Sequence, residues 1–308
     1  MLARFFSKSK PGNFLIVAFF MALFFIWVNA DTVVADFHLS KVIAEIAVLG
    51  TFIFSISVLD FIARKNDLTR RSAYKILFFA AFSLSFLAIL KDNSIIVANF
   101  FVLLALRRII SLKSRKEVRK KLFDATFWVC IASLFYFWSI LFLMIVYAGI
   151  LLHTSTYFKN WLIPLVGIFT VFLLVFGFHL VVYNEYYELS PWFDGSNFSF
   201  QNYKETRLLV PLLFISVMSA WAVLYYIGLM QKSSIRSRPT YILVLLTLGV
   251  ALAAAGLAPT KNGSELLFIF VPCSIILSNL FERKGLRLVK EILLILMVLM
   301  PFLTLIIS

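Results

Sequence analysis

The sequence predicts an all-α, polytopic integral membrane protein, and three of its features carry that prediction. Of the 308 residues, 62% are hydrophobic and 14% are charged, whereas a typical soluble domain is about one-quarter charged. The apolar residues form long uncharged runs, and most basic residues lie in short segments between these runs. Only helices and closed barrels satisfy the backbone in lipid, and the runs are far too long for barrel strands. We therefore expect one transmembrane helical domain over residues 1–308.

Eleven apolar runs are candidates for membrane-crossing helices, because about 20 apolar residues cover the hydrocarbon core of a bilayer. The clearest are 13–28, 42–62, 72–90, 161–183, 206–229, 240–258, 265–281 and 292–307. A ninth run, 94–112, is interrupted by Arg107-Arg108. We expect its hydrocarbon part to be 94–106, short enough to tilt or to stop below the far interface.

The remaining apolar stretch, 122–152, is too long for one crossing and short for two. We divide it near Tyr136-Phe137-Trp138-Ser139 into a compact hairpin. The alternative is one long tilted helix, which would reverse the orientation of everything that follows. The distribution of charge decides between the two, because cytoplasmic loops carry an excess of lysine and arginine.

With the division and a cytoplasmic N-terminus, 24 of the 29 basic residues lie on the cytoplasmic side. The five on the other side are Lys41, Lys91, Lys204, Arg207 and Lys261. Nine of the fifteen acids lie at or near that outer side. The sequence therefore predicts eleven spans in a bacterial cytoplasmic (inner) membrane, with a periplasmic C-terminus.

The start of the chain resembles a secretory signal sequence. A basic segment precedes an apolar one, and Val28-Asn29-Ala30 has the small residue pattern of a cleavage site. The apolar segment is already long enough to be a helix that spans the membrane. We therefore expect an uncleaved first helix, with cleavage as the alternative.

Several function classes are not favoured by the composition. The net charge of +14 would suit nucleic acid only if the basic residues covered a solvated face, and here they lie in short loops. Cys130 and Cys273 each lie in an apolar run, as small buried residues do. With three histidines and no CxxC pair, a closed zinc or haem site is not expected. The basic stretch 107–121 is interpreted as a topological anchor against anionic lipid.

The strongest candidate for chemistry is the first outer loop, NADTVVADFH (29–38). Asp31, Asp36 and His38 are its candidate catalytic residues, and Lys41 and Glu45 follow at the i,i+4 spacing that places them on one helix face. Carboxylates at the membrane surface suit a general base or a divalent cation with oxygen ligands. The alternative is that an outer loop is simply polar and tolerates acids.

A second group of candidates lies further along the chain on the same side. Arg207 and Lys261 each precede an apolar run that contains a proline. Together with Lys41 they are candidates for holding the phosphate of a lipid-linked donor, because cations at the membrane surface bind such groups. Glu265 lies near the start of its expected helix, where the helix dipole favours a carboxylate. The alternatives are interfacial snorkelling for the cations and helix capping for Glu265.

Two resemblances extend this interpretation. The opening RFFSKSKPGNF and the later KKLFDATFWVCIASLFYFWSILFL resemble an uncharacterised family of polytopic inner-membrane proteins from Bacteroidota-type bacteria, over nearly the whole chain. More weakly, the chain is similar to C-type glycosyltransferases that use polyprenyl-phosphate sugars. That resemblance implies a catalytic aspartate in the first outer loop, where Asp31 and Asp36 lie, although an adjacent acidic pair and a soluble domain are missing.

We carry three hypotheses of function from the sequence. The first is a glycosyltransferase-like enzyme that acts on a polyprenyl-phosphate-linked sugar or envelope polymer at the periplasmic face, with membrane lipid as its partner. It requires Asp31, Asp36, Arg207 and Lys261 to converge on one outward cleft. The second is a non-catalytic membrane subunit of a cell-envelope or secretion assembly, with membrane proteins as partners. The third is a transporter or flippase, although no inverted repeat is visible.

Overall fold

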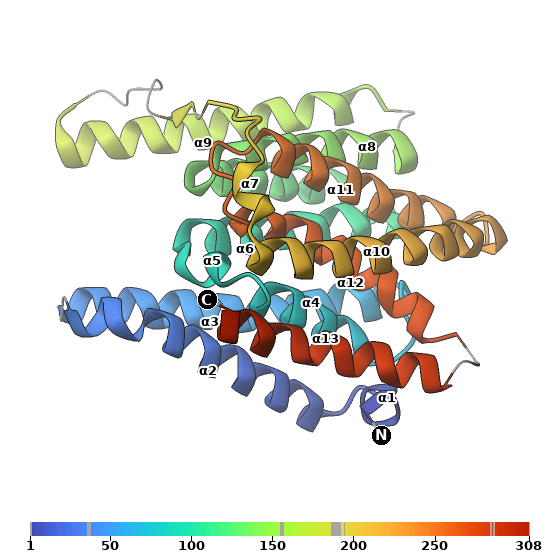
Figure 1. Cartoon of the computed structure of the whole chain (residues 1–308). Helices are drawn as coiled ribbons and strands as arrows, with labels where there is room; N and C mark the ends of the chain where they lie inside the picture. The colour runs from blue at the N-terminus through green and yellow to red at the C-terminus, as the bar shows by residue number, and fades with distance from the viewer. Residues whose placement is uncertain are drawn as a thin grey trace.

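The computed structural model describes residues 2–35, 38–154, 157–185, 192–193, 195–283, 285 and 287–307, and the side chains of 31–35, 287 and 307 fall outside that description. Its elements are α-helices and short 3-10 turns. The long helices lie side by side in one bundle, with their axes running in a common direction or its reverse (Figure 1).

The elements follow one another along the chain in three groups. The first comprises α1 (Leu2–Phe6), α2 (Pro11–Ala35), α3 (Leu39–Lys65), α4 (Tyr74–Leu84), α5 (Leu87–Lys91) and α6 (Asn93–Ile110). The second comprises η1 (Ser111–Ser114), α7 (Val118–Phe135), η2 (Phe137–Phe142), α8 (Leu143–His153) and α9 (Lys159–Tyr183). The third comprises η4 (Gln201–Lys204), α10 (Thr206–Lys232), α11 (Arg238–Leu257), η5 (Ser264–Leu266), α12 (Leu267–Phe281) and α13 (Arg287–Ile307).

Within the described ranges, eight helices are long and apolar enough to cross a membrane. They are Pro11–Ala30, Leu39–Lys65, Asn93–Ser114, Lys159–Tyr183, Thr206–Lys232, Arg238–Leu257, Ser264–Phe281 and Leu288–Ile306. Tyr74–Leu84 and Phe137–His153 are shorter apolar helices. The chain is therefore a multi-pass membrane protein built of helices, as its composition predicts.

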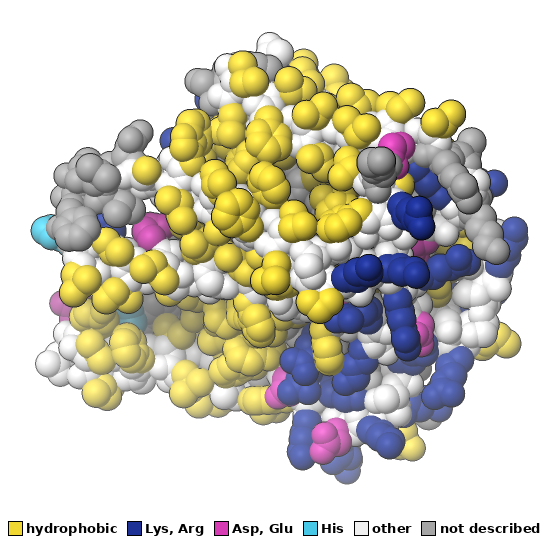
Figure 2. Space-filling view, turned by 90° about the horizontal axis from the view of Figure 1, so that it is seen from below, with side chains coloured by type: hydrophobic (Ala, Val, Ile, Leu, Met, Phe, Trp, Pro, Cys, Tyr) yellow, Lys and Arg dark blue, Asp and Glu magenta, His cyan; other side chains and the backbone are white. Residues whose placement is uncertain are grey.

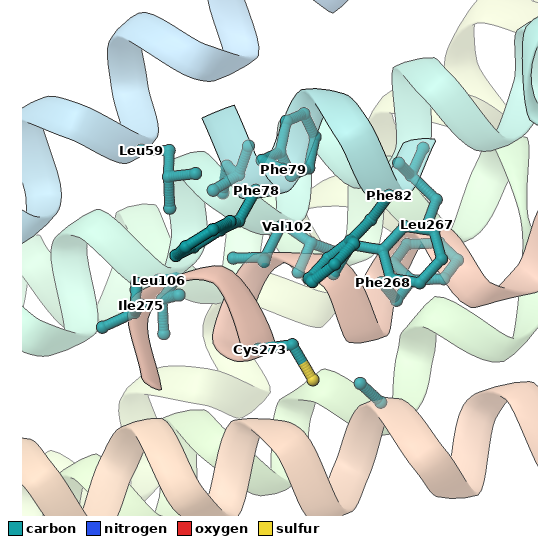
Figure 3. Packing of buried hydrophobic residues seen from close by; sticks show 14 of the residues in the cluster. Leu59, Phe78, Phe79, Phe82, Val102, Leu106, Leu267, Phe268, Cys273 and Ile275 are labelled. Carbon is teal, nitrogen blue, oxygen red and sulfur yellow. The ribbon is translucent and has the colours of Figure 1, made fainter. Parts of the chain in front are cut away.

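Helix α12 lies at the centre of the bundle. In its apolar stretch 94% of the residues are buried, against 11% in α9 at the periphery. It packs against α4, α10 and α11. Figure 3 shows the contact with α4 and α6 from close by, with Phe78 on the side of Leu106 and Ile275 and Phe82 on the side of Phe268.

An aromatic seam joins α4 to α12, and we use that name for Tyr74, Phe78, Phe82, Phe86, Phe270 and Phe281. The first four recur every four residues, so they form one row along α4 and its end. Ring centroids lie 4.9 Å apart for Phe78 and Phe281, 5.5 Å for Phe82 and Phe270, and 5.6 Å for Phe86 and Phe270. Each such pair contributes about 0.5–1.5 kcal/mol beyond the area it buries.

The apolar run 72–90, expected as one continuous span, is broken in the structure. Helix α4 ends at Leu84, Phe86 is extended (φ −120°, ψ 93°), and α5 begins at Leu87. The hydroxyls of Ser83 and Ser85 donate to the carbonyls four residues before them, Phe79 (2.8 Å) and Ala81 (2.7 Å). Such bonds compete with the helical ladder and bend helices. The hydropathy of the sequence does not reveal this break, because both serines lie in an otherwise apolar stretch.

The predicted division of 122–152 is confirmed, because α7 ends at Phe135 and Tyr136 is extended (φ −146°, ψ 106°) before η2. The helix in the run 94–112 is α6, which continues past the expected hydrocarbon part 94–106 to Ile110. Two contacts involve the arginines in its last turn. The Arg107 guanidinium lies 4.8 Å from the Phe61 ring centre, and Arg108 pairs with Asp124 at 2.9 Å.

The helix ends that carry most lysines and arginines meet at one end of the bundle, which we call the basic end. Contacts between distant segments join them there. The Ser9 amide donates to the Arg71 carbonyl (3.0 Å), and the Arg70 amide donates to the Glu282 carboxylate (2.8 Å). Figure 2 shows lysines and arginines crowded at this end of one face, beside a broad hydrophobic surface. The opposite end, built by residues 85–93, 201–208 and 258–265, is called the far end.

The close approach of α9 to α7 at Gly167 generates a stability prediction. A Cβ atom there would lie 2.9 Å from Thr126 Cβ and Cγ2, whereas a Cβ at Gly177 on the same helix would meet nothing within 4 Å. We expect Gly167→Leu to push the helices apart and destabilise the fold by about 1–3 kcal/mol, as overpacking does. Thermal unfolding of the detergent-solubilised chain measures this.

Gly177→Leu is the matched control for this test, because it gives the same gain in helix propensity without the clash. An equal unfolding temperature for the two variants would contradict the packing of α9 on α7.

Candidate functional site

A groove opens at the far end between α2, α5, the start of α10 and α13. Its volume is about 680 Å³, in the range of small-molecule sites, roughly 300–1,000 Å³. One part of the lining is apolar, with Trp27, Val28, Leu87, Ala88 and Leu208. The other part is polar, with Ser85, Lys91, Asn202, Glu205, Arg207 and Asn262. A groove of this kind suits a ligand with an apolar chain and a polar head.

The break between α4 and α5 shapes the inner wall of this groove. Ser85 is 2% exposed and lines the groove, while the side chain of Phe86 is fully buried beside it. The Phe86 ring packs against Gly263, where a Cβ would lie 3.0 Å from Phe86 Cδ1. Gly263 has φ +94°, a conformation that glycine adopts readily and other residues rarely do. This contact brings the loop before η5 to the groove.

Two cations of the groove come from different helices. Arg207 Nε donates to Glu205 Oε2 at 2.8 Å, and both side chains are about half exposed. Ion pairs this exposed contribute roughly 0–1 kcal/mol, so an anionic ligand can displace Glu205 from Arg207. Lys91, at the end of α5, is exposed and lines the same groove. The groove therefore offers two cations to an anion at its mouth.

Glu265 lies outside the groove and holds the η4 and η5 segments together. It is 1% exposed, and its two oxygens accept from the Tyr203 hydroxyl (2.6 Å) and the Gly263 amide (2.9 Å). Burial, and then the Glu265 charge, raise the pKa of the Tyr203 hydroxyl well above its usual value. Tyr203 thus stays protonated and keeps donating, and Glu265 acts as a tie between segments.

Lys261 is turned into the protein, and its ammonium caps α11. Lys261 is 2% exposed, and its Nζ donates to the carbonyls of Ala255 (2.6 Å) and Gly256 (2.7 Å). Nζ also lies 5.1 Å from the centre of the Phe200 ring. Burial lowers the pKa of this ammonium, and the Glu265 charge opposes that shift. Lys261 does not line the groove with Arg207, so the expected convergence of Asp31, Asp36, Arg207 and Lys261 on one cleft does not include Lys261. Its ammonium is bound by the carbonyls of α11, and Lys261 is not proposed as a phosphate ligand.

The predicted residues of the first outer loop are only partly described. Asp31 belongs to α2, next to Ala30, which lines the groove, but its side chain lies outside the described residues. Asp36 lies outside them altogether. His38 is exposed and precedes α3 as its cap residue, without a side-chain capping bond. The catalytic roles of these three residues remain predictions.

Lys41 and Glu45 follow on the first turns of α3. Glu45 Oε1 accepts from Asn93 Nδ2 at 2.7 Å, which ties α3 to the start of α6. Neither Lys41 nor Glu45 lines the groove. Among the residues whose side chains are described, no three His, Cys, Asp or Glu lie close enough to hold a metal ion. The divalent cation stays a prediction, since Asp31 and Asp36 are not in that set.

Sequence reasoning missed Lys91, Asn202 and Asn262 as groove residues. Lys91 had been counted only as one of the five outer cations, because the run 72–90 reads as an unbroken helix. Asp92 is the sequence signal that could have placed a helix boundary directly after Lys91. Its side chain accepts from the Ile95 amide (3.1 Å) as the N-cap of α6. Asn202 and Asn262 carry no comparable signal, since their approach depends on packing.

Comparison with known proteins places the whole chain in one family. Residues 1–307 match a family described as "Family of unknown function (DUF6427)". The chain belongs to this family. The match extends from α1 to α13, so the groove lies within the DUF6427 region, and the predicted membership of an uncharacterised family is confirmed. No curated protein and no solved structure matches the chain.

The Lys261 cap generates a prediction about stability. Lys261→Met keeps the apolar stem and removes two hydrogen bonds to the last carbonyls of α11. We expect a loss of about 1–3 kcal/mol, because those buried acceptors then lack a partner. The thermal midpoint of the purified chain measures this loss.

Lys204→Met is the control, because Lys204 is exposed and its neutralisation removes an equal charge at the same end. If the two variants unfold at the same temperature, Lys261 does not cap α11 in the folded protein.

Proposed function

We propose that this chain is an eleven-span inner-membrane protein that binds a polyprenyl-phosphate-linked sugar or envelope polymer in its far-end groove and transfers the sugar at the periplasmic face. One observation carries the proposal: Lys91 and Arg207 line a groove whose lining also includes the apolar side chains Trp27, Val28, Leu87, Ala88 and Leu208. A lipid-linked phosphate has the matching chemistry, since its chain is apolar and its head is a strong acceptor for charged donors.

The orientation in this proposal rests on the alternation of the chain between the two ends. The eight long helices count as one span each. The pairs α4–α5 and η2–α8 and the helix α7 add three more, giving eleven. The lysines and arginines of the basic end then lie in the cytoplasm, as the positive-inside bias favours. The groove faces the periplasm, and so does the C-terminus.

The chemistry of the proposal assigns Asp31 as the base. Asp31 follows the groove residue Ala30 near the end of α2. An acceptor hydroxyl attacks the anomeric carbon of the sugar and gives its proton to the Asp31 carboxylate. The bond from that carbon to the phosphate oxygen breaks, and the polyprenyl phosphate leaves with the electron pair. Arg207 and Lys91 stabilise the charge on the leaving phosphate.

A binding measurement tests the phosphate part of this proposal. The full chain is placed in phosphatidylcholine nanodiscs, and binding of polyprenyl phosphate is measured for the wild type and for Lys91→Ala/Arg207→Ala. We expect the double variant to bind at least about tenfold more weakly, because each charge-assisted hydrogen bond contributes about 1.5–3 kcal/mol.

Lys204→Ala is the matched control for binding, because Lys204 is exposed nearby and does not line the groove. If the double variant binds polyprenyl phosphate as tightly as the wild type, Lys91 and Arg207 do not hold the phosphate. Asp31→Asn separates binding from chemistry: it should bind polyprenyl phosphate normally and lose transfer of the sugar. Unchanged transfer of the sugar would contradict the role of Asp31 as the base.

A non-catalytic membrane subunit is the second candidate function, and α9 is the observation that favours it. From Phe172 to its end at Tyr183 this helix has no buried side chain. Figure 1 shows that half standing clear of the other helices. Native mass spectrometry of the chain extracted with its lipids discriminates the candidates: a companion chain at fixed stoichiometry favours the subunit, and a solitary chain that binds polyprenyl phosphate favours the enzyme.

A further inference from the structure

A second pocket lies at the basic end of the bundle, whereas the groove lies at the far end. Its volume is about 600 Å³. Three segments that are separate in sequence surround it: the end of α3, the continuous stretch from the end of α6 through η1 to the start of α7, and the loop between α10 and α11. Helix α3 and the loop after α10 therefore add their residues to the basic stretch 107–121.

The lining of this pocket is strongly positive. Among the described residues that line it, seven are basic and two, Asp67 and Glu117, are acidic. The basic side chains are Lys65, Arg107, Arg108, Lys113, Lys116, Lys121 and Arg236. Arg236 comes from the loop after α10, so the tertiary structure adds it to cations from α3, α6 and α7.

The protein itself neutralises few of these charges. In the part of the chain that the structure describes, Arg108 is the only one of the seven in an ion pair, with Asp124. Lys121 donates to the Ser111 carbonyl (2.8 Å) and to Ser114 Oγ (2.6 Å) in place of a carboxylate. Glu117 pairs at 3.0 Å with Lys120, which does not line this pocket.

Like charges are held close together here. Lys65 Nζ and the Arg107 guanidinium lie 5.1 and 4.8 Å from the centre of the same Phe61 ring. Burial, followed by the positive charges of Lys65 and Arg108, lowers the pKa of the Lys121 ammonium. Cations that repel one another at this density are stabilised by a bound anion.

The backbone of the surrounding turn is unusual as well. Arg115 (φ 53°) and Glu117 (φ 48°) both adopt the left-handed conformation, which is uncommon for residues other than glycine. Strained residues of this kind cluster at binding sites, where the surrounding structure holds them. Lys116 lies between these two residues and Lys113 lies just before them, and both lysines line the pocket.

We propose that this basic-end pocket binds a phosphate-bearing anion with two phosphoryl groups, distinct from the ligand of the far-end groove. Arginine and lysine together are the usual partners of phosphate oxygens, and one singly charged group would leave most of this lining without a counter-charge. Two sources share the chemistry: the head group of a diphosphatidyl lipid, which the membrane surface would supply, and a soluble diphosphate.

The test uses the full chain in nanodiscs with two probes, inorganic pyrophosphate and cardiolipin. Pyrophosphate binding is titrated in phosphatidylcholine nanodiscs, and retained cardiolipin is counted by native mass spectrometry from nanodiscs that contain it. The pocket variant is Lys113→Gln/Lys116→Gln/Arg236→Gln, which removes three charges that make no ion pair among the described residues. We expect it to weaken binding at least about tenfold, from the loss of charge-assisted hydrogen bonds.

The matched control is Arg4→Gln/Lys8→Gln/Lys10→Gln, which removes three exposed cations at the same end that do not line the pocket. We expect its binding to stay within about twofold of wild type. The single variant Lys116→Glu is a second test of binding, and because Lys116 is exposed we expect it to fold normally. Binding of pyrophosphate assigns a soluble source, and binding of cardiolipin alone assigns a lipid. Wild type that binds neither probe, or equal loss in the control variant, overturns the proposal.

Discussion

The packing of α12 against α4 holds the centre of the bundle together. In lipid, burying one apolar helix face against another gains little from the hydrophobic effect, so close packing and specific contacts determine the arrangement. The aromatic seam supplies such contacts along the full length of α4, from Phe281 at the basic end to Phe270 near the far end. Its last member, Phe86, also contacts Gly263 and thereby positions the groove.

The two ends of the bundle use charge in different ways. At the far end the buried charges are satisfied within the protein: Glu265 accepts from Tyr203 and Gly263, and Lys261 donates to two carbonyls of α11. The cations left exposed, Lys91 and Arg207, face the groove. At the basic end cations from several helices gather with few acids. A buried charge without a partner is costly, whereas an exposed one at a membrane surface is available to a ligand.

Much of the fold could be predicted from the sequence, because the length of each apolar run indicates whether it can form a helix that crosses a membrane. The division at Tyr136 followed from that length together with the placement of lysines and arginines. The break at Ser85 could not be predicted in this way, since it depends on two serine hydroxyls and on the Phe86 ring finding Phe270. Of the predicted site residues, Arg207 lines the groove, while Lys261 and Glu265 serve the protein's own backbone and Tyr203.

Hydropathy and charge along the chain are enough to identify a membrane protein built of helices and the segments that carry the positive charge. These properties are local: hydropathy and charge act residue by residue along the chain. The folded arrangement of the helices is needed to see that Lys91 and Arg207 share a groove and that Arg236 joins Lys65 and Arg107 around a pocket. Residues more than a hundred positions apart meet only when the helices between them pack, and in lipid that packing depends on the fit of side chains across the bundle.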